Sequence, residues 1–268
     1  MKKIVFQWAR RIMMRLKVLG CSGAEFPGRK PSGFLLEDKI LFDAGSLTKA
    51  LDIRGQRKIE AIFITHAHLD HVIGIPFLLD NIVVSNIWHR INIISIPPVV
   101  KTIRQNILNN SIWPDFTAIP DLANGIVGFT HLNPRESMKM HGYTITPYPV
   151  RHSVPATGYL IEDEEGKTVF YTGDTGPTGL TWRQLKGKKM DGLIIEVSFP
   201  DKMRGLAIKT GHLTPSLLKK EIDQIAPPPR KIFVTHIKPQ YLKTIQSEIR
   251  SLQMKNVKLL RDGEVLQI

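Results

Sequence analysis

The chain has very little cysteine and no long apolar run. Cys21 is its single cysteine, so no disulfide can form within the chain, and this composition fits a reducing compartment. No stretch approaches the roughly 20 apolar residues that cross a bilayer, and the N-terminal residues lack the apolar core of a secretory signal. We therefore expect a cytoplasmic protein with no membrane span.

Acidic residues are few relative to basic ones. Asp and Glu number 24 against 37 Lys and Arg, which gives a formal net charge of +13. An excess of this size attracts anionic partners such as phosphate-bearing ligands. Four of the positive charges precede the first strand-like run, namely Lys2, Lys3, Arg10 and Arg11. The other positive charges are dispersed along the chain.

The pattern of the chain predicts one compact domain behind a short extension. With 268 residues, of which 42% are hydrophobic, the chain can bury a sizeable core, and no repeat or low-complexity tract divides it. We expect residues 1–13 to form a basic N-terminal extension and residues 14–268 to form the domain. The extension is interpreted as a disordered tail, with a basic helix on a membrane surface as the alternative.

A cluster of histidines follows the apolar run at residues 59–64. Within six positions the chain carries three imidazoles and a carboxylate, which a bound cation would stabilise against mutual repulsion: His66, His68, Asp70 and His71. Imidazole and carboxylate are ligands that borderline divalent ions such as zinc accept. Because this spacing cannot serve one tetrahedral centre with all four side chains, the pattern predicts two adjacent metals.

Three further candidate ligands occur later in the same local setting. His152, Asp174 and His236 each follow an apolar run rich in Val, Ile, Phe, Tyr and Thr, which is typical of a strand. Loops at the C-terminal ends of strands are where α/β proteins collect functional residues. We therefore expect these side chains to join the first cluster. The preceding strands are predicted at residues 143–150, 168–172 and 231–235.

This arrangement resembles the metallo-β-lactamase superfamily over nearly the whole chain. The resemblance implies an α/β fold in four αβ/βα layers, with two mixed β-sheets flanked by helices, and a hydrolase domain over residues 14–268. It implies two divalent ions, zinc first with Mn²⁺ or Fe²⁺ as alternatives, in a two-metal mechanism, and a catalytic role for Asp70. The implied ligands are His66, His68 and His152 for one ion, Asp70, His71 and His236 for the other, and Asp174 between them.

A narrower resemblance rests on five blocks in the same order. Residues 110–116, 151–161, 173–177, 211–215 and 235–239 are similar to those of the class II cyclic-nucleotide phosphodiesterases. This implies hydrolysis of cAMP or cGMP to the nucleoside 5′-monophosphate by a homodimer. However, residues 75–79 read Ile-Pro-Phe-Leu-Leu, which is closer to ribonuclease Z. A ribonuclease Z-like tRNA endonuclease is therefore the alternative, and a non-catalytic metal-binding scaffold is a third hypothesis.

The middle of the chain is expected to carry substrate specificity. Residues 91–96 read as a strand, and residues 99–108 read as a helix after the Pro97-Pro98 break. Trp113, Asp115 and Phe116 then combine two flat apolar surfaces with a carboxylate, which suits a purine. The alternative is that both rings only cap the fold or fill a dimer interface. Ser153 and Thr214, from two of the matching blocks, are further candidate substrate contacts.

His212 is the remaining candidate catalytic residue. Thr214 is expected to cap the helix that Pro215 begins, which places His212 beside a helix N-terminus that favours a phosphate. There, His212 could contact a phosphoryl oxygen or protonate the leaving alkoxide. The alternative is that it only supports a metal ligand. His89, His131 and His141 match no block and are expected to have ordinary surface or packing roles.

Overall fold

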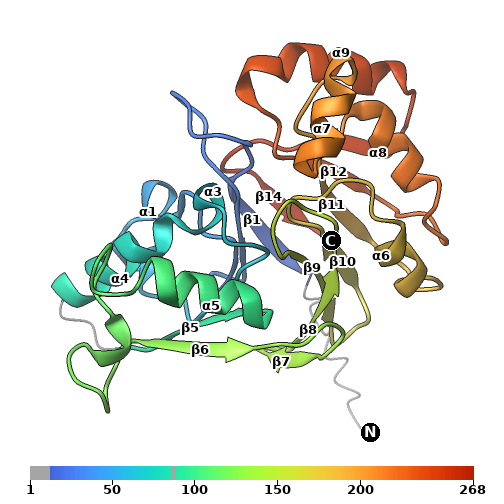
Figure 1. Ribbon diagram of the computed structural model, residues 1–268. Helices are drawn as coiled ribbons and strands as arrows, with labels where there is room; N and C mark the ends of the chain where they lie inside the picture. The colour runs from blue at the N-terminus through green and yellow to red at the C-terminus, as the bar shows by residue number, and fades with distance from the viewer. Residues whose placement is uncertain (1–12, 86–88) are drawn as a thin grey trace, which may run out of the picture.

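The structure of the chain is a computed structural model that describes residues 13–85 and 89–268. The predicted extension at residues 1–13 lies outside these residues apart from Met13, so this division of the chain stays a prediction. Two mixed sheets of seven strands each pack face to face in the described part of the chain, with helices on both outer faces (Figure 1). The predicted αβ/βα order of layers is confirmed.

The first sheet is built from the N-terminal half of the chain and the last strand. Strands β3 to β6 are parallel, and β14, β1, β2 and β3 pair antiparallel. In sheet order the strands are β14 (Val265–Gln267), β1 (Arg15–Gly20), β2 (Gly33–Leu36), β3 (Ile40–Phe42), β4 (Ala61–Phe63), β5 (Ile91–Ser95) and β6 (Val127–His131).

The second sheet repeats this mixture with the C-terminal half. Strands β10 to β13 are parallel, and β10, β9, β8 and β7 pair antiparallel. In sheet order the strands are β13 (Val257–Leu259), β12 (Ile232–Thr235), β11 (Gly192–Glu196), β10 (Thr168–Tyr171), β9 (Thr157–Asp163), β8 (Tyr143–Pro149) and β7 (Met138–Met140).

The central strands are mostly apolar because both of their faces are buried. In β4, Ala61 and Phe63 belong to the core between the two sheets, whereas Ile62 belongs to the core under the first set of helices. In β12, Phe233 faces the inter-sheet core and Val234 faces the second set of helices. Side chains alternate between the two faces of a strand, so a sandwich with helices outside requires continuous apolar runs.

Helices cover the outer face of each sheet (Figure 1). Over the first sheet lie α1 (Leu47–Ala50), α2 (Ile53–Gln56), α3 (Leu69–Val72), α4 (Gly74–Val84), α5 (Pro97–Asn106) and the short η1 (Phe116–Ala118). Over the second lie α6 (Gly179–Gln184), η2 (Asp201–Met203), α7 (Arg204–Thr210), α8 (Pro215–Ile222), η3 (Pro239–Tyr241) and α9 (Leu242–Ser251).

The structure confirms the predicted start of one helix, α8, and corrects the predicted start of another, α5. Helix α8 begins at Pro215, and the Thr214 side chain accepts a hydrogen bond from the Leu217 backbone N–H, as predicted. Helix α5 begins at Pro97 rather than after the proline pair. Proline is tolerated in the first turn because the N–H it lacks has no intrahelical acceptor there. The pair is therefore the start of the helix and not a break before it.

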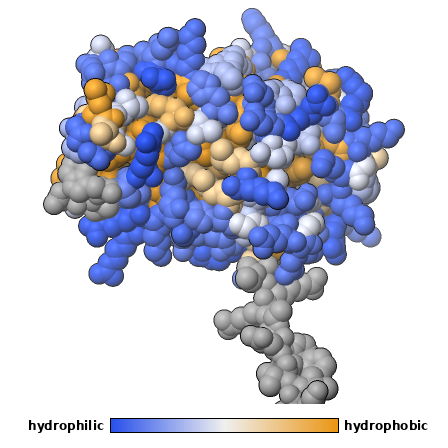
Figure 2. Space-filling model, turned by 90° about the horizontal axis from the view of Figure 1, so that it is seen from below, coloured by the Kyte–Doolittle hydropathy of each residue, from blue (hydrophilic) through white to orange (hydrophobic). Residues whose placement is uncertain are grey.

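The face of the molecule that carries the edges of the two sheets at β6 and β7 is mostly hydrophilic (Figure 2). Seen from the side of β6 and β7, hydrophobic residues form patches between hydrophilic ones (Figure 2). Among the residues that the structure describes, no helix has both the length and the apolar character needed to cross a bilayer.

Candidate metal centre

The predicted metal ligands meet where loops from the two sheets converge. His66 follows β4 of the first sheet, whereas His152, Asp174 and His236 follow β8, β10 and β12 of the second sheet. Their ligand atoms form groups in which all atoms lie within 4.8 Å of one another. The groups are His66, His68, His152 and Asp174; Asp70, His71 and His236; and Asp174, His212 and His236.

Asp174 lies between the first two groups. Its Oδ1 is 3.4 Å from His71 Nε2, and its Oδ2 is 3.3 Å from His236 Nε2 and 3.7 Å from His66 Nε2. The structure therefore brings together all seven residues predicted as ligands, and Asp174 takes the central place among them.

Four of the histidines present Nε2 toward the common centre because their Nδ1 atoms have other partners. His71 Nδ1 is 2.8 Å from Asp43 Oδ2, and His152 Nδ1 is 2.8 Å from the Gly211 carbonyl. His66 Nδ1 is 3.0 Å from Thr65 Oγ1, and His236 Nδ1 is 2.9 Å from Ser198 Oγ. An Nδ1–H that donates to an oxygen leaves the Nε2 lone pair free, which is how a neutral imidazole binds a metal.

Two buried atoms of the centre have electron pairs that a cation would accept. His66 Nε2 and Asp174 Oδ1 have no hydrogen-bond partner within the described residues, although both atoms are buried. Buried polar groups normally have partners, and these two are both electron-pair donors. The donor set of imidazoles and carboxylates therefore fits divalent ions such as zinc.

The pKa shifts of the histidines show that some of them stay neutral, and that the nearby carboxylates stabilise a positive charge at the centre. Burial holds the pKa of His66 and His68 below the usual value. Burial also acts to lower the pKa of His71, but the carboxylates of Asp174 and Asp43 outweigh it and raise that pKa. Carboxylates that stabilise an extra proton on an imidazole would equally stabilise a metal ion.

Asp43 is a supporting residue that the sequence prediction missed. It is fully buried, and its carboxylate accepts hydrogen bonds from the Thr65 backbone N–H, the Thr65 hydroxyl and the Tyr171 hydroxyl, besides its contact with His71. Its φ of 56° lies in the left-handed region that aspartate adopts only at a cost. The sequence signal was an aspartate directly after the apolar run at residues 40–42.

A second missed group links His212 to a metal ligand. The fully buried Glu196 holds His212 Nδ1 at 2.6 Å through Oε1, and its Oε2 accepts the Ser198 hydroxyl at 2.8 Å. Ser198 Oγ in turn faces His236 Nδ1. Burial acts to lower the pKa of His212, but Glu196 raises it to about 8. One carboxylate therefore orients both the predicted catalytic histidine and a predicted ligand.

Gly211 allows the close approach of this segment to His152. It adopts a φ of 74°, and a Cβ at this position would lie 2.9 Å from the His152 Cα. Any other residue would therefore push away the carbonyl that holds His152 Nδ1. This explains why a glycine precedes His212.

Three of the residues predicted to bind substrate are buried or partly buried, which limits their contact with a ligand. Phe116 is only 2% exposed and packs in the core under the first helices, so it has no free face on which a base could stack. Thr214 is fully buried as a helix cap. Trp113 is partly buried, with its ring 5.5 Å from that of Phe77. Both Phe116 and Thr214 therefore have structural roles instead.

The other two predicted substrate contacts keep exposed or partly exposed atoms. Ser153 is exposed next to His152, and its role as a substrate contact stays a prediction. Asp115 is partly exposed, and its Oδ1 accepts from the backbone N–H and hydroxyl of Thr117. Within the described residues its loop contacts α4 and the core rather than the ligand cluster.

Comparison with known proteins identifies similar chains. Residues 39–237 match the family described as "Beta-lactamase superfamily domain". A "Probable 3′,5′-cyclic-nucleotide phosphodiesterase" of Yersinia pestis is 28% identical over 209 residues, covering 69% of this chain and 59% of the relative. The chain thus spans about three fifths of the length of that relative.

A second relative and a solved structure match over more of their length. A "Ribonuclease Z" of Archaeoglobus fulgidus is 24% identical over 290 residues, covering 87% of this chain and 90% of the relative. The crystal structure of the metallo-beta-lactamase fold protein YhfI from Bacillus subtilis has a TM-score of 0.78 at 20% identity, covering 95% of this chain and 99% of that one. At this identity the structural likeness concerns the fold.

Proposed function

Because the chain belongs to the β-lactamase superfamily domain family and brings together groups of side chains that could hold metal ions, we propose that it is a metal-dependent phosphodiesterase. Its proposed substrates are 3′,5′-cyclic nucleotides, cAMP or cGMP, and its products are nucleoside 5′-monophosphates. The proposed cofactors are two divalent ions, zinc first, with Mn²⁺ or Fe²⁺ as alternatives. We propose that the protein is cytoplasmic, as the single cysteine suggests, and that it is a homodimer, as the resemblance implies.

The observation that carries this proposal is the convergence of four Nε2 atoms whose Nδ1 partners are all in place. Such pre-oriented lone pairs, with Asp174 between them, are what two adjacent ions require. A non-catalytic scaffold would not need the complete set. In the proposed assignment His66, His68 and His152 hold one ion, Asp70, His71 and His236 hold the other, and Asp174 contacts both.

In the proposed reaction, side chains of the protein orient the attacking water and donate a proton to the departing oxygen. Two ions bound here would lower the pKa of water and neutralise charge on the phosphoryl oxygens. Asp70, whose side chain is 30% exposed, can accept a hydrogen bond from the attacking water. His212 donates Nδ1–H to Glu196, which leaves Nε2 as the atom that can contact the phosphate or the departing 3′ oxygen.

Product analysis tests the proposal directly. Purified protein loaded with zinc or manganese is incubated with cAMP, cGMP and 3′-extended tRNA, and the products are separated by chromatography. We expect 5′-AMP or 5′-GMP from the wild type and neither from Asp174→Ala. Cleavage of the tRNA with negligible hydrolysis of either cyclic nucleotide would contradict the cyclic-nucleotide assignment while keeping the metal-dependent phosphodiesterase.

A ribonuclease Z-like nuclease is the second candidate, and a basic cleft favours it. A cleft of about 850 Å³ beside α9 is lined by Arg29, Arg250 and Arg261. Its carboxylates have other partners: Asp262 accepts the backbone N–H groups of Cys21 and Lys30, and Glu264 pairs with Lys258. The three guanidinium groups are therefore available to phosphates of a nucleic acid.

Salt dependence separates the two candidates. For single strands, the logarithm of affinity falls with the logarithm of salt concentration by about 0.7 per neutralised phosphate. If the cleft binds nucleic acid, the triple variant R29Q/R250Q/R261Q should reduce that slope by about 2 with an oligonucleotide. The matched triple K186Q/K188Q/K189Q, which removes the same charge from exposed residues elsewhere, should keep the wild-type slope. Equal slopes in all three proteins would reject the cleft as a nucleic-acid site.

A further inference from the structure

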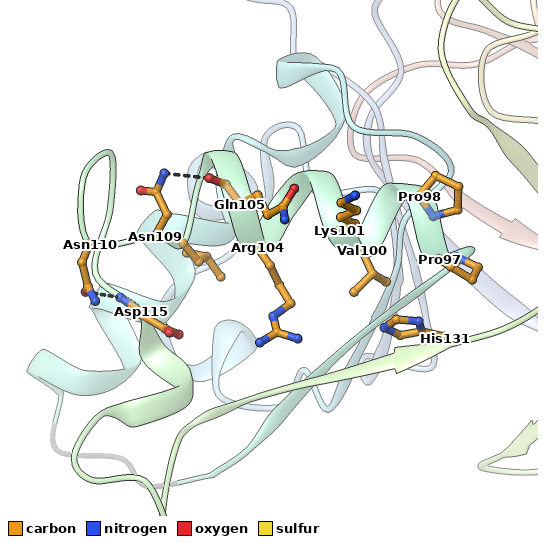
Figure 3. Close-up of a pocket in the computed structure, with 11 residues that line it drawn as sticks. Pro97, Pro98, Val100, Lys101, Arg104, Gln105, Asn109, Asn110, Asp115 and His131 are labelled. Carbon is orange, nitrogen blue, oxygen red and sulfur yellow. Dashed lines mark hydrogen bonds between the residues drawn. The ribbon is translucent and has the colours of Figure 1, made fainter.

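A second cavity lies along helix α5, on the side of the first sheet. It has a volume of about 830 Å³ and is bounded by α5, by the loop that follows this helix, and by strand β6 (Figure 3). Small-molecule sites usually have volumes of about 300 to 1,000 Å³. None of the proposed metal ligands lines this cavity, so it is a separate space that the proposed reaction does not use.

The cavity carries unneutralised positive charge. Lys101 and Arg104 line it and are exposed, and neither forms an ion pair with a carboxylate among residues 13–85 and 89–268. The Arg104 guanidinium lies 5.3 Å from the Phe129 ring centroid, a cation–π contact that holds it at the wall formed by β6. Figure 3 shows Arg104 extending from α5 between Asp115 and His131. A phosphate is the natural partner for this fork of donors.

The rest of the wall suits a flat body with a polar edge. Val100 and Leu108 are buried, so the accessible apolar surface comes from Pro97, which is partly exposed, and Pro98, which is exposed. Asn110 Oδ1 accepts the Asp115 backbone N–H, which leaves the Asn110 amide donors for a ligand. Asp115 Oδ1 accepts from Thr117, and its Oδ2 remains to accept. An amide and a carboxylate match the polar edge of a nucleobase.

The cavity adjoins the metal centre through α5 without opening into it. Pro98 lines both this cavity and a smaller one of about 130 Å³ that also includes His68 and Thr102. Residues on an α-helix are rotated by about 100° per position, so Lys101 and Arg104 lie on a different face of α5 from Val99 and Thr102. A ligand in the larger cavity would therefore contact the helix that flanks His68 without contacting the metals.

We propose that this cavity is a second binding site, specific for a nucleoside monophosphate, with Lys101 and Arg104 on the phosphate and Asn110 and Asp115 on the base. The site holds its ligand without cleaving it, because the metal ligands lie elsewhere. The inference is independent of which phosphodiester the metal centre hydrolyses.

Photoaffinity labelling locates the bound nucleotide. The metal-loaded protein is irradiated with 8-azido-AMP, and labelled peptides are identified by mass spectrometry. We expect label in peptides from residues 97–117, at least about tenfold weaker in R104Q and in K101Q because each loses a charge-assisted contact. The matched control K186Q, an exposed lysine in the other half of the chain, should label like the wild type.

Competition and folding controls make the outcome unambiguous. AMP should displace the label from residues 97–117 at concentrations at least about tenfold lower than adenosine or inorganic phosphate alone. Melting temperatures test whether R104Q is folded. K101Q is a second variant, and because Lys101 forms no ion pair with a described carboxylate, its replacement should not unfold the protein. Label confined to peptides that contain the metal ligands, equal labelling of the 97–117 peptides in all variants, or equal competition by adenosine would overturn the proposal.

Discussion

The metal centre and the loop at residues 109–117 are held by different kinds of hydrogen bond. In the centre, Asp43 joins His71 and Tyr171, which are 28 and 128 positions away. In the loop, the Asn109 carboxamide accepts from the backbone N–H groups of residues two and three positions on, and the Asn110 carboxamide accepts from a residue five positions on.

This difference decides what each region can do. Some bonds of the centre, such as that of Tyr171 to Asp43, join the two sheets, so the ligand geometry depends on the packing of one sheet against the other. Residues 109–112 of the loop are joined by local side-chain hydrogen bonds, so this part can rearrange at a free-energy cost below that of global unfolding, whereas Phe116 packs the end of the loop into the core. A fixed centre suits metal binding and chemistry, whereas a locally bonded loop suits adjustment to a ligand in the neighbouring cavity.

Asp174→Ala should give the largest effect. Because Asp174 is the residue proposed to contact both ions, its loss should lower the metal content from two equivalents toward one or none and remove phosphodiesterase activity. Metal analysis and turnover of the purified variant measure this. His141→Ala, which only loses a surface contact with Glu60, is the control and should change neither. A variant that kept both equivalents and its turnover would refute the shared-ligand assignment.

His212→Ala should lower kcat by about 10² to 10⁴ while both metals stay bound. If His212 donates a proton, the loss should be largest for cAMP, whose departing alkoxide is a poor leaving group, and smallest for a p-nitrophenyl ester. If it contacts the phosphate, both substrates should lose rate equally. Loss of metal would instead indicate that His212 supports the ligands, and unchanged kinetics with full metal content would remove it from the site.

Asp43→Ala should destabilise the fold by about 3 to 5 kcal/mol, because it leaves a buried imidazole and two buried hydroxyls without their shared acceptor. Metal affinity should also fall by about 10- to 100-fold. Urea denaturation of the metal-free protein and competitive metal titration measure the two effects. A loss of affinity without any loss of stability would mean that Asp43 orients His71 without holding the sheets together.

Phe116→Ala should lower the free energy of unfolding by about 3 to 5 kcal/mol through the cavity left in the core. Since the ring has no exposed face, KM for cAMP should stay near the wild-type value. Denaturation and steady-state kinetics test this pair of outcomes. A stable variant with a raised KM would restore the stacking role predicted from the sequence.

Asp115→Ala should give the smallest effect, about 1 kcal/mol, because only the local hydrogen bonds to Thr117 are lost. Urea denaturation beside Asp43→Ala compares two aspartates that differ in the range of their contacts. An equal loss of stability in the two variants would mean that the 109–117 loop is as firmly coupled to the fold as the metal centre is.

The residues of the centre that could be predicted are those in short motifs at strand ends. The cluster from His66 to His71 and the later His152, Asp174 and His236 stand directly after apolar runs, so the pattern of the sequence locates them without the fold. The cap at Thr214 was predictable for the same reason, since the Thr-Pro pair acts on the next few residues.

The residues that escaped prediction depend on contacts between distant segments. Asp43 meets Tyr171 only because the two sheets pack face to face, and Glu196 meets His212 across 16 positions of chain. The burial of Phe116 was equally hidden, because an aromatic residue in a loop does not itself indicate whether the ring faces the core or the solvent.

The division of the ligands between the two sheets has a consequence for the order of folding. One group takes His66 and His68 from the first sheet and His152 from the second, and the other takes Asp70 and His71 from the first and His236 from the second. Neither half of the chain contains all the ligands proposed for either ion, so binding of both ions must follow the docking of the halves. By mass action, free metal would then pull nascent chains toward the docked state, and metal supply in the cell would regulate how much of this protein survives proteolysis.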